Sequence, residues 1–239
     1  MDWTDYDAAL FDLDGVLTPT AEVHMRAWDV MFNAYLEGRD DHQRPYTEQD
    51  YFDFVDGKPR YDGVRSFLAS RGITLPDGTP EDASDLETVC GLGNRKNDAF
   101  SAVLRDEGVT PYPASVALLD DLRARGTAVA VVSSSRNAPA VLAAAGLADR
   151  FEVVVDGQVA AAAGLPGKPA PDTYLYAAQQ LGVTKERSVV LEDALSGVQS
   201  GRAGDFGLVV GVDRGAGEQA LLDGGADVVV RELDELIAR

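Results

Sequence analysis

The chain of 239 residues has few of the residue types on which several classes of protein depend. A single cysteine, Cys90, excludes an intrachain disulfide framework and fits a reducing compartment. Because no His or Asn adjoins Cys90 in sequence, we expect a packed apolar side chain rather than a nucleophile. Only two histidines, His24 and His42, are present, which argues against a multi-histidine zinc site.

Positive charge and long apolar runs are also scarce. The chain carries 21 Lys and Arg against 40 Asp and Glu, a formal net charge of −19. Neutralising the phosphates of a nucleic acid or an anionic membrane takes clustered Lys and Arg, so we expect neither as a partner. No run approaches the ~20 apolar residues of a membrane helix, and residues 1–5 lack the apolar core of a secretion signal. We therefore expect a cytoplasmic location.

The chain does contain a regular alternation of short apolar runs and helical segments. Six runs predict β-strands, over residues 6–11, 127–132, 151–155, 188–191, 206–210 and 227–230. Four segments predict helices, over residues 114–125, 138–145, 172–181 and 194–203, and each has a capping glycine just past its end, at Gly126, Gly146, Gly182 and Gly204. Apolar strands that alternate with helices are typical of a parallel sheet covered on both faces. We predict a doubly wound α/β fold whose ligands lie at the carboxyl ends of the strands.

The alternation stops between about residues 20 and 108. This stretch predicts helices over 22–36, near 61–71 and near 97–107, and a polar segment over 38–45. We therefore divide the chain into an α/β core, residues 1–19 and 109–239, and an inserted α-helical domain, residues 20–108. An insert that leaves the sheet directly after the first strand is expected to cover that strand's carboxyl end. Residues 160–164 are interpreted as a short Ala/Gly loop.

The most informative segment is the octet at residues 11–18, Phe-Asp-Leu-Asp-Gly-Val-Leu-Thr. Its carboxylates, Asp12 and Asp14, lie where an apolar run stops, and unpaired charges at a strand end cost stability unless something compensates them. A divalent cation would do so, and one carboxylate could then attack phosphorus while the other handles protons. The alternative is a solvated turn, because Asp-Gly is common turn chemistry.

Three other segments place complementary groups at strand ends or in adjacent loops. Ser133 offers a hydroxyl that suits a phosphoryl oxygen, although taken alone it is better explained by the N-cap of the next helix. Lys168 lies in a stretch stiffened by two prolines, where a held ammonium can fix a phosphate and an attacking carboxylate together. Glu192 and Asp193 end a second apolar strand with the oxygen ligands that Mg²⁺ uses. A cation there would relieve the repulsion between two acid-terminated strands.

The chain resembles the haloacid-dehalogenase-like phosphotransferases, and specifically their β-phosphoglucomutase group. The resemblance lies in the order of four motifs along the chain: the DxDGxxT octet, the Ser133 hydroxyl, the Lys-Pro pair and the Glu-Asp pair. The similarity covers nearly the full length, and it is carried by residues 20–28, 57–60, 93–98, 133–137, 168–172 and 192–194. The two acidic pairs identify only the superfamily, whereas 20–28 and 95–98 are much more specific. The resemblance implies an enzyme with a Rossmann-like core and an inserted helical cap.

The resemblance also implies roles in the core. Asp12 would be the nucleophile that becomes an aspartyl phosphate, and Asp14 the general acid and base, with a backbone carbonyl that also binds metal. Ser133 and Lys168 would hold the transferring phosphoryl group. The metal would be Mg²⁺, at a site formed by the acidic residues Asp12, Asp14, Glu192 and Asp193. Of these, Glu192 would be either a ligand or a neighbour that supports one.

In the cap, the resemblance places Arg60 where the distal phosphate of a sugar bisphosphate is gripped. His24 and Lys96 match a pair that links closure of the cap to Asp14. A lone His on a helix is usually structural, and lone Lys and Arg side chains are usually solvated. The assignments of His24, Lys96 and Arg60 therefore rest on the resemblance.

Thr20, Arg136 and Asn137 complete the implied substrate residues, Thr20 from the cap motif and the other two from the cap–core interface. One departure follows the octet, because the family commonly has Asp where this chain has Pro19. Pro19 either begins the first cap helix or stiffens closure. The cap also carries extra residues at 38–46 and 75–85 that could alter the sugar pocket.

The leading hypothesis for function is the interconversion of β-D-glucose 1-phosphate and glucose 6-phosphate, with Mg²⁺ and a phosphorylated Asp12. The alternative is a phosphatase that acts on a sugar phosphate or another small phosphomonoester. A non-catalytic protein that retains the fold would have lost Asp12, Asp14, Lys168 or Asp193, and all four are present. The expected partner is a small phosphorylated sugar, and we expect a monomer.

Overall fold

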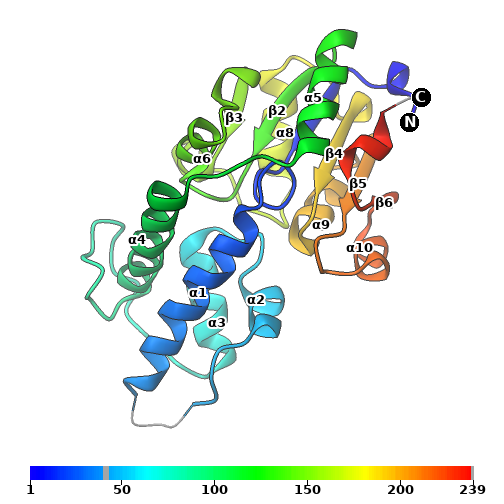
Figure 1. The fold of residues 1–239 in the computed structure, drawn as a ribbon. Helices are drawn as coiled ribbons and strands as arrows, with labels where there is room; N and C mark the ends of the chain where they lie inside the picture. The colour runs from blue at the N-terminus through cyan, green and yellow to red at the C-terminus, as the bar shows by residue number, and fades with distance from the viewer. Residues whose placement is uncertain (40–42, 238–239) are drawn as a thin grey trace. The chain divides into compact units, whose positions relative to one another are not determined.

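A computed structural model describes residues 1–39 and 43–237, and the chain folds into two compact units. One unit combines Met1–Pro19 with Val109–Arg239 and contains the sheet; the other, Thr20–Gly108, is helical (Figure 1). Within the described residues, every helix is too short or too polar to cross a lipid bilayer.

The sheet has six parallel strands in the order β3-β2-β1-β4-β5-β6. The strands are β1 (Ala8–Phe11), β2 (Ala128–Val132), β3 (Val153–Val155), β4 (Ser188–Glu192), β5 (Leu208–Val212) and β6 (Val228–Val230). β1 pairs with β2 on one side and β4 on the other, so that Phe11 is level with Val131 and Leu191. The residues that follow these three strands therefore meet at one edge of the sheet, where the strand order reverses.

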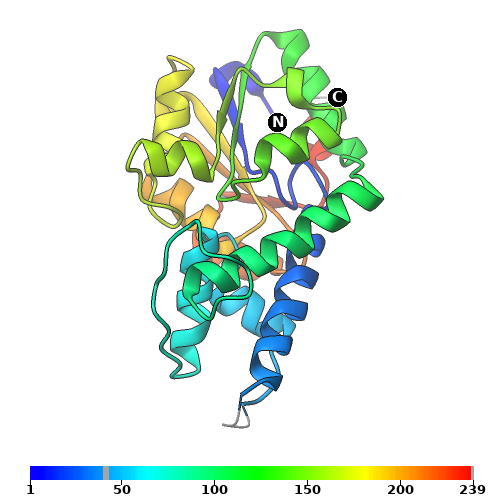
Figure 2. The same cartoon turned by 90° about the vertical axis from the view of Figure 1, so that its left-hand side faces the viewer.

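Helices cover both faces of this sheet, which confirms the predicted fold class. The helices of this unit are α5 (Pro113–Arg125), α6 (Ala138–Ala144), α7 (Gly157–Ala162), α8 (Asp172–Gln180), α9 (Leu195–Ala203) and α10 (Glu218–Gly224). Right-handed crossovers assign α5 and α6 to one face and α8, α9 and α10 to the other. Figure 2 shows α5 and α8 on opposite sides of the sheet. Tyr174 of α8 and Val198 of α9 pack with Leu10 and Val190 in one buried cluster.

The predicted strands agree with the observed ones to within two residues at each end, and the four predicted core helices to within one. Of the glycines predicted to cap helices, Gly126, Gly146 and Gly182 have positive φ. Gly204 is the C-cap of α9, as predicted, but its conformation differs from that of the other three. Gly204 is right-handed, with φ −79°, and the left-handed residue is Asp205. Gly204 is required for space instead, because a Cβ there would lie 2.5 Å from the ring of Phe206.

The interpretation of residues 160–164 as a loop was also wrong, since α7 continues to Ala162. Its N-cap is Asp156, whose carboxylate accepts hydrogen bonds from the backbone N–H groups of Gln158 and Val159 at 2.9 and 2.8 Å. A single cap therefore starts a helix that the Ala/Gly composition does not reveal. Two further short helices, α10 and α2 (Glu48–Phe54), lie where no helix was predicted.

The second unit is built from α1 (Thr20–Glu37), α2, α3 (Arg60–Ser70) and α4 (Val89–Glu107). Aromatic side chains fill its core, and the ring centroids of Phe32 and Phe67 lie 4.1 Å apart. Pro19 directly precedes α1 rather than beginning it. Residues 40–42 of the predicted polar segment 38–45 lie outside the described residues.

α4 begins eight residues before the predicted start at 97. Thr88 caps it by accepting a hydrogen bond from Gly91 N–H at 2.9 Å. Gly91 and Gly93 lie in the first turns, and glycine disfavours a helix interior by about 1 kcal/mol, which concealed these turns in the sequence. Gly93 is required by packing, because a Cβ there would lie 2.8 Å from the Tyr61 ring. Cys90, also in these turns, is buried as predicted.

A buried ion-pair network fixes the segment before α2. The Asp50 carboxylate is 2% exposed and accepts hydrogen bonds from Arg44 at 2.8 and 3.2 Å and from Arg71 at 2.8 Å. Thr47 donates to it through its backbone N–H and its hydroxyl. Burial opposes ionisation of Asp50, but these hydrogen bonds and the charge of Arg71 outweigh burial, so the pKa of Asp50 is lowered.

Replacing Asp50 by Asn should lower the free energy of unfolding at pH 7 by about 3 kcal/mol, because Arg71 would remain buried without its carboxylate. Since the folded-state pKa of Asp50 is lowered, its contribution is complete above the ordinary Asp value of about 3.9 and is lost as the pH falls through the folded value. Urea unfolding at pH 7 and pH 3 measures both effects. Asp53→Asn is the control, because Asp53 accepts a surface hydrogen bond from Gln49; an equal loss in both variants would contradict the prediction.

Candidate active site

One ammonium group joins the ends of the three central strands. Lys168 Nζ donates hydrogen bonds to Asp12 after β1, to Val132 O at the end of β2, at 3.1 Å, and to Glu192 at the end of β4. All three charged side chains are buried, with 7% of Asp12 and 4% of Lys168 exposed. The structure therefore brings together residues that the sequence places far apart.

The charges in this cluster control one another. Burial raises the pKa of Asp12 well above its ordinary value; Lys168 opposes this shift, and Glu192 and Asp14 add to it. Burial works against the charge on Lys168, but the charges and hydrogen bonds of Asp12 and Glu192 outweigh burial and raise the pKa of Lys168. The ammonium is therefore held in its charged form. A cation bound beside Asp12 would act against the rise in its pKa and favour the ionised carboxylate.

Glu192 has most of its oxygen lone pairs occupied by the protein. Besides Lys168, it accepts hydrogen bonds from the Tyr174 hydroxyl at 3.1 Å and from the Ala194 N–H at 3.0 Å. A Cβ at Gly197 would overlap its carboxylate, so the first turn of α9 also needs a glycine at this point. Tyr174 was not predicted as a site residue, and a tyrosine in a helical segment gives no signal of this contact. Burial and the charge of Glu192 raise the pKa of Tyr174, which keeps its hydroxyl a donor.

Three carboxylates converge in a way that fits a divalent cation. Asp12, Glu192 and Asp193 each offer an oxygen, and these oxygens lie within 4.8 Å of one another. Hard oxygen donors of this kind suit Mg²⁺. The carboxylate of Asp14 lies outside this group of three, half-buried and 3.4 Å from the hydroxyl of Ser133.

The turn after Asp14 requires its glycine. Gly15 has φ +86°, and a Cβ there would overlap the carboxylate of Asp193. Thr18 closes the turn, because Gly15 N–H donates to Thr18 O at 2.7 Å and Thr18 N–H donates to Leu13 O at 3.1 Å. The turn is buried over residues 15–18, so it is not the solvated Asp-Gly turn that was the alternative interpretation.

Ser133 lies beside the carboxylates rather than at a helix start. It is 4% exposed, its hydroxyl donates to Asp14, and it accepts from Ser135 N–H at 3.1 Å. α6 begins five residues later, at Ala138. Asn137 occupies the N-cap position of α6, and its side chain makes no capping hydrogen bond. Arg136 adjoins α7, where its carbonyl accepts a hydrogen bond from the Gln158 side chain at 3.2 Å.

In the helical unit, Lys96 is a buried cation rather than a solvated one. It is 3% exposed, and its Nζ lies against His24 Nδ1 and 5.0 Å from the ring centroids of both Trp28 and Phe100. The His24 ring stacks on Phe100 at 4.0 Å. Aromatic faces attract a cation, which offsets part of the cost of burying the ammonium.

Arg60 is the first residue of α3, and its guanidinium donates to Asn94 at 3.2 Å and to Asn97 at 2.6 Å. Thr20, the first residue of α1, is buried. The predicted residues therefore form two sets. The sheet unit contains the predicted residues of the octet and of the other strand ends. The helical unit contains Thr20, His24, Arg60 and Lys96.

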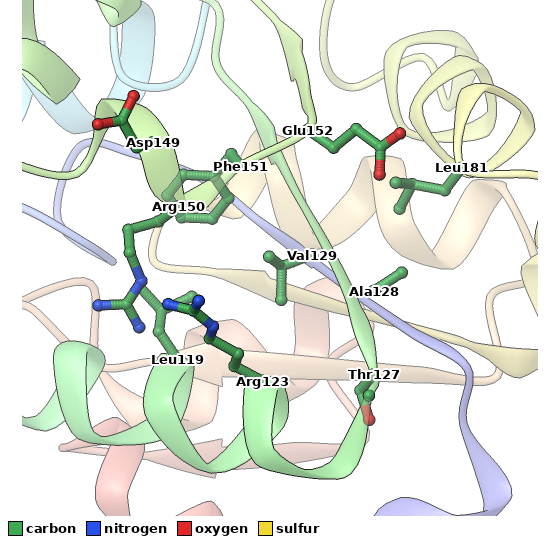
Figure 3. A pocket seen from close by; sticks show the side chains of 11 residues that line it. Leu119, Arg123, Thr127, Ala128, Val129, Asp149, Arg150, Phe151, Glu152 and Leu181 are labelled. Atoms are coloured by element: carbon green, nitrogen blue, oxygen red, sulfur yellow. The ribbon is translucent and has the colours of Figure 1, made fainter.

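A pocket of about 440 Å³ lies elsewhere on the sheet unit (Figure 3). It is lined by Ala128 and Val129 at the start of β2, by Arg123 of α5 and by Arg150 and Phe151 before β3. The carboxylate cluster follows the opposite ends of the strands. The pocket is therefore not part of that cluster.

Comparison with known proteins identifies the family. The family model for haloacid dehalogenase-like hydrolases matches residues 6–205. A β-phosphoglucomutase of Mycobacterium bovis is 52% identical over 96% of this chain and 91% of its own length, and one of Bacillus subtilis is 32% identical over the same shares. The crystal structure of a β-phosphoglucomutase from Clostridium difficile superposes with a TM-score of 0.76 at 26% identity, over 97% of this chain and 93% of that one. The chain therefore belongs to the haloacid dehalogenase-like hydrolase family and is an enzyme of that family.

Proposed function

We propose that the enzyme transfers a phosphoryl group through an aspartyl phosphate on Asp12 and interconverts β-D-glucose 1-phosphate and glucose 6-phosphate. The observation that carries the phosphoryl-transfer step is the buried Lys168 ammonium between Asp12 and Glu192. An ammonium fixed at the attacking carboxylate can also neutralise an incoming phosphoryl oxygen. The choice of sugar is supported by similarity to β-phosphoglucomutases over most of the chain.

Each core residue has a separate role in the proposed phosphoryl transfer. Asp12 would attack phosphorus, and Ser133 and Lys168 would hold the phosphoryl oxygens. Asp14 is half-buried and hydrogen-bonded to Ser133, a position from which it can give a proton to, or take one from, a sugar hydroxyl close to the transferring group.

We propose that Mg²⁺ is held by Asp12, Asp193 and the backbone carbonyl of Asp14. Glu192 already accepts from Lys168, Tyr174 and Ala194, so we assign it to orienting Lys168 rather than to direct ligation. When bound, Mg²⁺ would neutralise the clustered carboxylates and the charge of the phosphoryl group.

The helical unit, residues 20–108, would act as the cap, and residues 1–19 and 109–239 as the core. Arg60 would bind the distal phosphate of the bisphosphate intermediate, and His24 with Lys96 would respond to the protonation of Asp14. Thr20, Arg136 and Asn137 would contact the sugar phosphate. A mutase must keep water from its aspartyl phosphate while the sugar reorients, which is the use of a cap. A cytoplasmic location and a monomeric state stay predictions.

The proposal is tested with purified protein, Mg²⁺, β-D-glucose 1-phosphate and a trace of the 1,6-bisphosphate. We expect glucose 6-phosphate, followed by coupled oxidation, and little inorganic phosphate, because the cap excludes water. The alternative, a phosphatase, takes its support from the hydrolase description of the matching family model. Release of inorganic phosphate without glucose 6-phosphate would establish the phosphatase and reject the mutase.

A further inference from the structure

The turn that follows Asp14 presents three consecutive backbone carbonyls to other segments of the same unit. Gly15 O accepts a hydrogen bond from Arg214 Nε at 3.0 Å. Val16 O accepts from the Ser115 hydroxyl at 2.7 Å, and Leu17 O accepts from the Tyr112 N–H at 3.0 Å. Each carbonyl thus has its own donor, and the turn is held from outside as well as by its internal hydrogen bonds.

Arg214 is itself fixed in place. It follows β5, its side chain is 18% exposed, and its two terminal nitrogens bind the two carboxylate oxygens of Glu232 at 2.9 and 3.2 Å. The guanidinium lies 4.1 Å from the ring centroid of Tyr112. The two terminal nitrogens of the Arg214 guanidinium bind Glu232, and the guanidinium lies against the Tyr112 ring. These two contacts fix the orientation in which Nε donates to Gly15 O.

Gly15 is confined on its other side by a residue of the carboxylate cluster. The Asp193 carboxylate lies where a Cβ of Gly15 would be, so the Gly15 backbone cannot move toward Asp193 without displacing it. Arg214 holds Gly15 through its carbonyl, and Asp193 limits it at Cα. Gly15, the residue that directly follows Asp14, is therefore restrained at two of its own atoms, the carbonyl oxygen and Cα.

We propose that Arg214 is a positioning residue for phosphoryl transfer, acting through the Gly15 carbonyl to set where Asp14 and Asp193 lie. The inference rests on the proposed function: its activity readout depends on the proposed sugar reaction, whereas its calorimetric readout depends only on the proposed Mg²⁺ site. Arg214 need not touch substrate to act. A displacement of about 1 Å in a catalytic group can cost 10²-fold in rate, and loss of a residue that orients metal ligands typically costs about 10–100-fold in affinity or activity.

The chain offers a matched arginine for the control. Arg187 also makes a forked ion pair, to Asp7 at 2.5 and 2.8 Å, and also donates to a backbone carbonyl, Thr4 O, at 3.3 Å. It precedes β4, at the end of the strands away from the carboxylate cluster. Replacing Arg187 by Met therefore removes a comparable set of contacts without touching the octet.

The experiment compares Arg214→Met, Arg214→Lys and Arg187→Met. Mg²⁺ affinity is measured by isothermal titration calorimetry without sugar, and kcat and KM are measured in the mutase assay. We expect Arg214→Met to weaken Mg²⁺ binding about 10-fold and to lower kcat about 10–100-fold with little change in KM. Arg214→Lys keeps the charge and one donor and should lie between Arg214→Met and wild type. Arg187→Met should match the wild type in all three quantities.

Two results would overturn the proposal. If Arg214→Met bound Mg²⁺ as tightly as the wild type or more tightly, Arg214 would act only as a charge opposing the metal or not at all. If Arg187→Met lost as much Mg²⁺ affinity and kcat as Arg214→Met, the effect would be one of general stability. Should the wild type lack mutase activity, the proposed function fails, while the calorimetric comparison still decides the role of Arg214.

Discussion

Replacing Asp12 by Asn should abolish formation of the phosphoenzyme and lower turnover by at least about 10⁴-fold, as losses of catalytic nucleophiles do. An amide is a poor nucleophile toward phosphorus, although it fills nearly the same volume as the carboxylate. The fold should persist, because an Asn at this position can still accept a hydrogen bond from Lys168 and removes one of three clustered carboxylates. Incubation with ³²P-labelled sugar bisphosphate, acid quench and autoradiography measures the phosphoenzyme.

The control for this variant is Asp7→Asn. Asp7 precedes the same strand at its other end, where it pairs with Arg187 on the surface. It should label as strongly as the wild type. Labelled phosphate on the Asp12→Asn protein would show that the nucleophile lies elsewhere.

The second large effect is expected from Lys168→Met, which combines loss of activity with loss of stability. Removing the ammonium leaves Asp12 and Glu192 buried beside each other without a cation, and breaking a buried pair in this way costs about 3–5 kcal/mol. Turnover should fall by about 10²–10³-fold, as when a donor to a developing charge is removed. Urea unfolding and the mutase assay measure the two losses separately.

The stability loss in Lys168→Met should depend on pH. Without the ammonium, burial and the charge of Glu192 raise the pKa of Asp12 in the folded state unopposed, so the folded protein binds more protons than the unfolded chain above pH ~4. The free energy of unfolding of the variant then falls as the pH rises above ~4. The difference in unfolding free energy between wild type and variant should therefore be smaller at pH 5 than at pH 8. Lys185→Met, which removes a half-exposed pair with Asp205, is the control. An equal deficit at both pH values would contradict this account.

Much of the sheet and of its carboxyl-end residues could be predicted from the sequence, because the strands consist mostly of apolar residues, and polar residues lie at or just after the carboxyl ends of the three central strands. Asp12, Ser133 and Glu192 are examples, since each lies at or just after the end of one of the three central strands. Parallel pairing then brings such residues together whatever the separation in sequence.

Other parts could not be predicted, for reasons that lie in packing. The first turns of α4 contain Gly91 and Gly93, which oppose a helix by propensity but are required by close neighbours. Tyr174 contacts Glu192, and Arg214 contacts Gly15, only in the folded chain. Neither Tyr174 nor Arg214 stands out from its surroundings in sequence. In sequence, Lys96 cannot be distinguished from a solvated lysine on a helix. Its burial becomes evident only in the folded chain, where the rings of Trp28 and Phe100 lie beside it.

The position of Lys168 makes assembly of the candidate active site depend on pairing of the three central strands. Its partner Asp12 lies 156 residues away in the chain, and its other contacts are on β2 and β4. The ammonium can reach all three only when β1 is paired on both sides. A partly folded chain in which either neighbour of β1 is unpaired therefore lacks the complete set of Lys168 contacts, and on the proposed function it could not yet transfer a phosphoryl group.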